Sequence, residues 1–193
     1  MKTLHAQILF RLALATLLAL ACTHAKSEPI GGDFQLIDQD GRPFSLSQVR
    51  GKVVVLSFGY TFCPDICPTT LAVISAALRQ LGDQADRVQG IFISLDPDRD
   101  TPEKLREYVR YFDARLIGLT GTAKELKEVA DRYRVRYAFV GKGEREHYSL
   151  DHSAAIYILD TEGRVARLVP YGLPPEEIVE TVRGLLGTHR PSG

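Results

Sequence analysis

The chain has 193 residues, a length that supports one domain with a substantial hydrophobic core. Lysine and arginine total 24, and aspartate and glutamate also total 24, so the charge balance argues against a nucleic-acid-binding protein. Apolar residues make up 45% and charged residues 25%, as in ordinary globular proteins.

The N-terminal segment has the pattern of a secretory signal. A positively charged start precedes an apolar run at 12–21, which is shorter than the about 20 residues that a membrane span needs. Ala19 and Ala21 give a small-x-small cleavage pattern directly before Cys22. We therefore predict a signal peptide or targeting segment at 1–21. The protein is expected to be exported to the periplasm or another extracytoplasmic compartment, with simple cleavage and lipid anchoring at Cys22 as the two alternatives.

The next segment begins with a hairpin pattern. In "DFQLIDQDGRPFSL", residues 33–46, apolar residues alternate on both sides of the turn signal QDGR. The run "KVVVLSFGY" at 52–60 is nearly all apolar and rich in valine, which predicts a strand buried on both faces. A helix is expected next, because Leu71, Ile74 and Leu78 recur at helical spacing.

The remaining segments continue to alternate between the two patterns. Strands are predicted at 88–96 and 116–121 and as a pair within 153–172, and helices at 100–112, 122–135 and 174–187. Helices that alternate with buried strands indicate an α/β fold, with a central mixed sheet flanked by helices and an N-terminal hairpin extension. Thioredoxin-like folds have this order of elements.

One domain accounts for most of the chain. We assign it to residues 33–187, between a tether at 22–32 and a C-terminal tail at 188–193. The basic and aromatic run "RYRVRY" at 132–137 is interpreted as a solvated helix end, with a docking patch as the alternative. We expect a monomer.

Two cysteines stand at the junction of a strand and a helix, in "FGYTFCPDICPTT". A disulfide between Cys63 and Cys67 would close a very short loop and would remove little entropy from the unfolded chain, so a stapling role explains the pair poorly. Within a helical first turn, positions four apart share one face, with Cβ atoms about 5–6 Å apart. A helix N-terminus also stabilises thiolates. The pair therefore suits a soft metal ion, thiol–disulfide chemistry, or both.

His152 is the candidate third ligand. It stands in "SLDHSAAIYILD", in a loop before an apolar strand, and a thioredoxin-like topology brings that loop opposite the cysteines. Two thiolates and one imidazole form a soft, low-coordinate set that suits Cu(I). Structural zinc takes four protein ligands, and His147, which we expect at the surface, is the one obvious fourth candidate.

The acidic run "SLDPDRDTP" permits two interpretations. Asp96, Asp98 and Asp100 could hold a second cation or contact a partner. A turn followed by a helix cap explains them equally well, with Pro102 in the first helical turn and Asp100 or Thr101 as the cap. The cap is the preferred role for Asp100.

Three segments together resemble the Sco/SenC family of copper-handling proteins: "GYTFCPDICPTTL", "SLDPDRDTPEKLREYV" and "YSLDHSAAIYILDTEG". The resemblance extends over residues 30–187. It implies a thioredoxin-like, exported and membrane-tethered domain that binds copper, as Cu(I) or Cu(II), through Cys63, Cys67 and His152. Asp96 matches an acidic family position near the site and is not expected to be a ligand.

The resemblance also implies a role and partners. The family delivers copper to the binuclear copper site of cytochrome c oxidase subunit II, or to another copper-receiving protein, and keeps the recipient's cysteines reduced. Because thiolate is the ligand form, an oxidised cysteine pair cannot bind copper, and this predicts a thiol reductase partner.

The alternative function is that of a thiol–disulfide oxidoreductase, in which Cys63 attacks a disulfide and Cys67 resolves it. Such enzymes usually have C-x-x-C, whereas this chain has C-x-x-x-C. The resemblance also implies that Asp151 and His152 occupy the neighbourhood where those enzymes place a cis-proline. These differences favour a metallochaperone that is not an enzyme, although the two activities can coexist. A peroxidase is the third possibility, and no arginine is placed by a motif to activate a peroxide.

Overall fold

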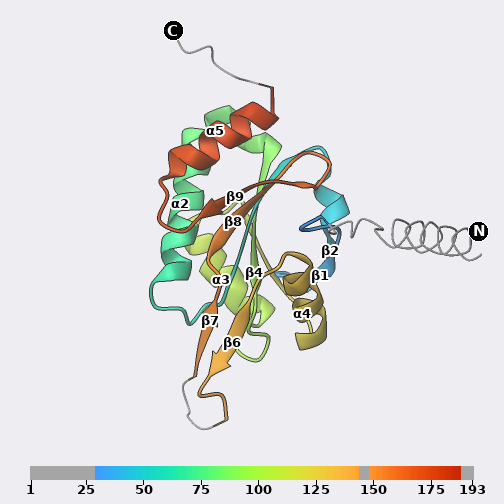
Figure 1. The fold of residues 1–193 in the computed structure, drawn as a ribbon, viewed down its shortest axis with the longest axis vertical. Coiled ribbons are helices and arrows are strands. Elements are labelled where there is room, and N and C mark those ends of the chain that lie inside the picture. Colours follow the sequence, from blue (N-terminus) through green and yellow to red (C-terminus); the bar gives the residue numbers. More distant parts are fainter. Residues whose placement is uncertain (1–28, 144–147, 188–193) are drawn as a thin grey trace, which may run out of the picture.

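The structure, a computed structural model, describes residues 29–143 and 148–187. They form a seven-stranded sheet with the order β2-β1-β5-β4-β3-β8-β9 and a separate two-stranded sheet of β6 and β7 (Figure 1). The strands are β1 (Gln35–Asp38), β2 (Pro43–Ser45), β3 (Val53–Gly59), β4 (Val88–Ser94), β5 (Leu116–Thr120), β6 (Tyr137–Val140), β7 (Ser149–His152), β8 (Ala155–Leu159) and β9 (Val165–Pro170).

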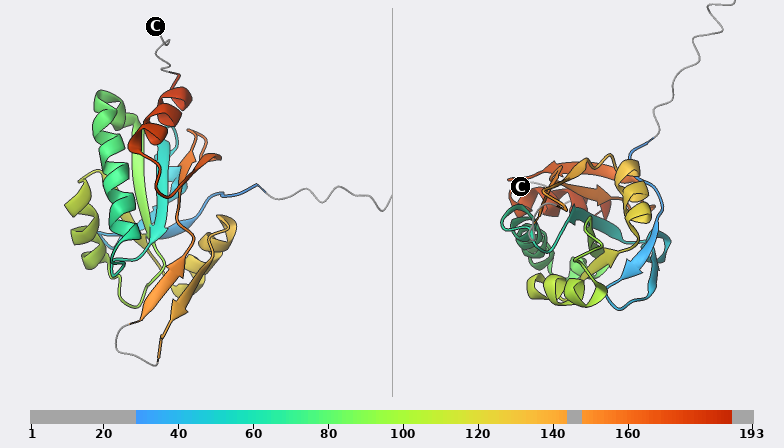
Figure 2. Two further views of the ribbon diagram at one scale, coloured as in Figure 1. Left: turned by 60° about the vertical axis from the view of Figure 1, so that its left-hand side comes forward. Right: turned by 90° about the horizontal axis from the view of Figure 1, so that it is seen from below.

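The large sheet is mixed and has helices on both faces. The central strands β3, β4 and β5 are parallel, while β1 and β8 join them antiparallel. Helices α2, α3 and α5 lie on one face and α4 on the other (Figure 2). These observations confirm the predicted α/β class and the N-terminal hairpin. The helices are α2 (Ile66–Gln80), α3 (Pro102–Phe112), α4 (Ala123–Arg132) and α5 (Pro175–Leu185), with 3-10 helices η1 (Leu46–Val49) and η2 (Gly82–Arg87).

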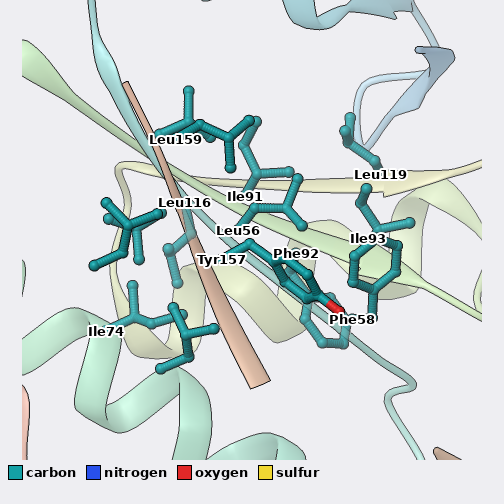
Figure 3. Close-up of a cluster of buried hydrophobic side chains, with 14 of the residues drawn as sticks. Leu56, Phe58, Ile74, Ile91, Phe92, Ile93, Leu116, Leu119, Tyr157 and Leu159 are labelled. Carbon is teal, nitrogen blue, oxygen red and sulfur yellow. The ribbon is translucent and has the colours of Figure 1, made fainter. Parts of the chain in front are cut away.

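The core lies on both faces of the central strands. Every residue of β3 is buried, as its continuous apolar run predicted. On one face Phe92 packs against Tyr108 of α3, and on the other Phe58 contacts Tyr133 and Tyr157. Figure 3 shows part of this cluster, including Ile74 from α2. The strands that carry the site loops are therefore fixed in the most buried part of the molecule.

The structure decides two alternatives that the sequence left open at helix starts, and for the cap of α3 it selects Thr101 over the preferred Asp100. Helix α2 begins at Ile66, so Cys63 precedes the helix and does not share a helical face with Cys67. The cap of α3 is Thr101, whose hydroxyl accepts the amide of Lys104 at 3.4 Å. Asp100 has a different role, which is described with the site.

The segment that carries His152 also differs from the prediction. His152 ends strand β7, whereas a loop was expected there, and it pairs with Tyr137 of β6. The run at 132–137 forms the end of α4 and the turn into β6, as the helix-end interpretation predicted. His152 therefore belongs to a hairpin outside the large sheet.

Several predictions concern residues outside the described ranges. These are the targeting segment 1–21, Cys22, most of the tether, His147 and the tail 188–193. No helix within 29–143 or 148–187 is long and apolar enough to cross a membrane. At the start of the described chain, the Gly31 amide donates to the Arg132 carbonyl at 2.9 Å, which attaches this segment to the end of α4.

Candidate metal centre

The cysteine loop connects the buried end of β3 to the start of α2. Cys63 lies in the turn before the helix and is half-buried, whereas Cys67 lies in the first helical turn and is buried. The Cys67 amide donates to the Cys63 sulfur, with 3.4 Å between nitrogen and sulfur. This bond holds the Cys63 sulfur against the first turn of α2, beside the N-terminal end of the helix.

Gly59 provides the space for the buried cysteine. A Cβ atom at this position would lie 2.5 Å from the Cys67 sulfur and 2.9 Å from the Phe92 ring. Either distance is far below van der Waals contact, so a residue with a side chain would displace the sulfur or the strand. The glycine that ends β3 therefore belongs to the site.

His152 reaches the cysteines from the opposite side. Its Nε2 lies 3.4 Å from the Cys67 sulfur, and its Nδ1 lies 3.2 Å from the Ser153 carbonyl oxygen. When Nδ1 carries the proton it donates to that carbonyl, which leaves the Nε2 lone pair free to bind a metal. The Tyr60 ring packs edge-on against the imidazole, with 6.3 Å between centroids.

The three side chains form one group that could hold a metal ion. The sulfurs of Cys63 and Cys67 and a ring nitrogen of His152 lie within 4.8 Å of one another. The structure thus brings together the three residues that the sequence singled out. Among the described residues, no further histidine, cysteine or carboxylate joins this group.

Burial sets the protonation of two of the donors. It raises the pKa of the Cys67 thiol well above its usual value, and the neighbouring Cys63 raises it further. Burial also lowers the pKa of His152, so the imidazole is neutral near pH 7. Neutral imidazole is the ligand form, whereas the Cys67 proton must leave when a cation binds.

The acidic run neither caps α3 through Asp100 nor contributes ligands to the group. Asp100 is buried and accepts the Thr61 amide at 3.0 Å, the Thr61 hydroxyl at 2.6 Å and the Ser94 hydroxyl at 2.6 Å. It therefore holds the cysteine loop against the end of β4. Burial raises the pKa of this carboxyl.

The other two acidic residues contact the histidine hairpin. Asp96 is buried and binds Arg99 and the Tyr148 hydroxyl, while the exposed Asp98 pairs with Lys142 at 2.6 Å. The run thus joins the parts of the site, and among the described residues its carboxylates are engaged with cations or hydroxyls. Sequence reasoning assigned no role to Arg99 or Tyr148, because no local pattern shows that they touch.

Comparison with known proteins decides the family. The family model described as SCO1/SenC matches residues 23–187. The chain belongs to the SCO1/SenC family. A SCO2-like protein of Rickettsia felis is 40% identical over 156 residues, which are 80% of this chain and 76% of that protein.

Solved Sco structures share the fold. ScoI of Bradyrhizobium japonicum, solved with copper bound, is 42% identical with a TM-score of 0.75, over 81% of this chain and 99% of that one. ScoI of Arabidopsis thaliana, also solved with copper bound, is 35% identical with a TM-score of 0.76, over 83% and 99% of the two chains. These neighbours confirm the thioredoxin-like fold that the order of elements predicted.

Proposed function

We propose that this Sco protein is a copper metallochaperone that binds copper through Cys63, Cys67 and His152 and passes it to a copper-receiving protein. The observation that carries the proposal is the meeting of two cysteine sulfurs and an imidazole nitrogen within 4.8 Å. The copper-bound state of two Sco neighbours that are at least 35% identical supports the choice of metal.

The donor set favours copper over structural zinc. Two thiolates and an imidazole suit the soft Cu(I) ion in low coordination, whereas structural zinc takes four protein ligands. Cys63 and His152 border a pocket of about 440 Å³ that is also lined by Tyr60, Pro64 and Leu150. An ion held there stays open to a fourth, incoming ligand.

Release would proceed by ligand exchange. Cys63 is more exposed than Cys67, so a thiolate of the recipient would reach the ion on the Cys63 side. The incoming thiolate replaces the Cys63 sulfur, and further recipient ligands then replace Cys67 and His152. No electron is transferred, and each thiolate that leaves copper regains a proton or stays as an anion.

The recipient we propose is the binuclear copper site of cytochrome c oxidase subunit II. This assignment, the exported location and a membrane tether at Cys22 follow from the resemblance of the motifs and from the targeting pattern. A thiol reductase is proposed as a second partner, since an oxidised Cys63–Cys67 pair would lack the thiolate ligands. The protein is proposed to act as a monomer.

The asymmetry of the two cysteines favours a second, accessory activity, the reduction of a recipient's disulfide. The Cys63 sulfur is partly exposed and can attack a disulfide, whereas Cys67 is buried behind it and donates its amide to that sulfur. Attack by Cys63 forms a mixed disulfide and releases one recipient thiolate. Cys67 then attacks Cys63, releases the second recipient thiolate and closes the Cys63–Cys67 disulfide, so two electrons pass to the recipient.

The copper stoichiometry of the purified, reduced protein tests the proposal. We expect one copper per wild-type chain and a lost or much weaker site in His152→Ala, with two reduced thiols counted for Cys63 and Cys67 in both. Ser149→Ala, an exposed change on the same strand, is the matched control and should bind like the wild type. Mixing the loaded protein with the isolated copper domain of subunit II should then transfer the ion.

Other outcomes would contradict the proposal. Absence of copper from the wild type together with a readily reducible disulfide would make the thiol–disulfide activity primary. Full copper binding in His152→Ala would remove the histidine from the site.

A further inference from the structure

We propose that Arg99 is a positioning residue that sets the place of His152 relative to the two cysteines. It does so by bridging the cysteine loop and the β6–β7 hairpin. The consequence for copper binding rests on the proposed function, whereas the bridging itself is a property of the metal-free protein.

The hairpin needs such a bridge because it lies outside the large sheet. Strand β7 pairs with β6 alone among the described strands, and Figure 1 shows the two projecting beyond the end of the sheet. One hydrogen bond joins the backbone of β7 to the cysteine loop directly, from the Leu150 amide to the Tyr60 hydroxyl, and it is long at 3.3 Å. Side chains must therefore supply much of the attachment.

Arg99 contacts the hairpin through both an edge and a face of its guanidinium. Nη1 donates to the Tyr148 carbonyl at 2.8 Å, and the guanidinium carbon lies 3.6 Å from the centre of the Tyr148 ring. Asp96 completes the unit, because one carboxylate oxygen accepts Arg99 Nε and the other accepts the Tyr148 hydroxyl at 2.7 Å. The Asp96 side chain is fully buried and that of Arg99 is 16% exposed, so water competes little for these bonds.

The same guanidinium contacts the cysteine loop. Its central carbon lies 4.7 Å from the centre of the Phe62 ring and 5.6 Å from that of Tyr60, and Phe62 directly precedes Cys63. Arg99 thus lies between aromatic rings of both halves of the site. Its Nη2 is buried without a hydrogen-bond partner among the described residues, which leaves the aromatic contacts to compensate.

The geometry requires arginine. A planar guanidinium binds a carboxylate and a carbonyl through different edges and stacks on a ring at the same time. Lysine would keep the charge next to Asp96 but would lose the stacking and the fixed direction toward Tyr148. Loss of an outer partner of a metal ligand typically weakens metal binding by about 10–100-fold.

A double-mutant cycle on the full chain tests the proposal. Cu(I) affinity is measured by competition with a chromophoric chelator for wild type, Arg99→Lys, His152→Ala and the double variant. We expect Arg99→Lys to weaken binding at least about tenfold in the wild-type background and to change nothing further once His152 is absent. Arg106→Lys, whose ion pair with Asp40 is partly exposed, is the matched control and should leave affinity unchanged.

Hydrogen exchange in the metal-free protein provides a readout that does not depend on copper. Arg99→Lys should speed deuterium uptake in a peptide spanning Ser149–His152, while Arg106→Lys should not. If the wild type binds no copper, the proposed function fails and this exchange alone decides the positioning role.

Two results would overturn the proposal. These are an equal loss of affinity with and without His152, and unchanged exchange in β7. If Arg99→Lys does not fold, Tyr148→Phe keeps the ring, removes the hydroxyl bound to Asp96, and should give the same pattern with a smaller loss.

Discussion

The two halves of the candidate metal centre are held in different ways. The cysteines follow β3, which is buried along its whole length and lies between β4 and β8 in the large sheet. The histidine ends β7 in a two-stranded sheet, in which exposed residues alternate with buried or half-buried ones. The cysteine half is thus fixed by the core, and the histidine half by a few side-chain contacts. Changes in the second half should therefore alter metal binding with little effect on the fold.

The largest expected effect comes from filling the space behind the buried cysteine. Gly59→Ala would place a Cβ atom 2.5 Å from the Cys67 sulfur and 2.9 Å from the Phe92 ring. We expect a loss of stability of about 1–3 kcal/mol, as for other overpacked cores. Copper affinity should fall by more than about tenfold, because the added methyl group would displace the Cys67 sulfur from its place in the group. Urea denaturation of the reduced protein and copper titration measure the two effects.

Gly184→Ala is the matched control for this change. Gly184 lies in α5, and a Cβ atom there would have no neighbour within 4 Å. The substitution should stabilise the protein by about 0.5–1 kcal/mol through helix propensity and should leave copper binding unchanged. Normal copper binding by Gly59→Ala would show that the cysteine loop shifts to accommodate the methyl group and is not fixed by the core.

The second prediction concerns the unequal reactivity of the two cysteines. Only the thiolate reacts with an alkylating reagent, and burial raises the pKa of Cys67, so its thiolate fraction is small at neutral pH. Alkylation at pH 7–8 should modify Cys63 at least about tenfold faster, because each pKa unit changes the thiolate fraction tenfold.

The pH dependence has a defined sign. Below its raised pKa, the Cys67 thiol gains thiolate as the pH increases, so its alkylation rate should increase steadily with pH. Mass spectrometry of the peptides separates the two sites. Equal rates at pH 7 would contradict the buried, protonated state assigned to Cys67.

The smallest expected effect comes from the hydrogen bond between Tyr60 and Leu150, which joins the two halves of the site directly. Tyr60→Phe removes the hydroxyl that accepts the Leu150 amide and leaves that buried N–H unpaired. Loss of such a bond is expected to lower the free energy of unfolding by about 1 kcal/mol. If the bond serves to hold His152 in place for metal binding, the same free energy corresponds to an about fivefold lower copper affinity. Copper titration beside urea denaturation measures it.

Tyr111→Phe is the control, since Tyr111 is 86% exposed and lies in α3, away from the candidate site. It should match the wild type in both measurements. A loss of stability in Tyr60→Phe without any loss of affinity would mean that this bond helps to hold the hairpin but does not set the position of His152.

The sequence by itself determined the α/β class, the approximate positions of β3 and α2, and the three candidate donors. Its signals are local. A buried strand and a helix are visible as apolar periodicity, and the cysteines lie four residues apart at the junction of the two. The order of elements placed His152 opposite the pair, and the resemblance of three motifs indicated the same three residues.

Only the tertiary structure decided how the donors are held. Asp100 binds Thr61 from 39 residues away, and Arg99 binds the Tyr148 carbonyl from 49 residues away. The expectation that Asp100 caps α3 failed because a cap is a local preference, which three bonds to the cysteine loop and β4 outweigh. Contacts across such separations depend on the path of the whole chain, and no local pattern of residue types records that path.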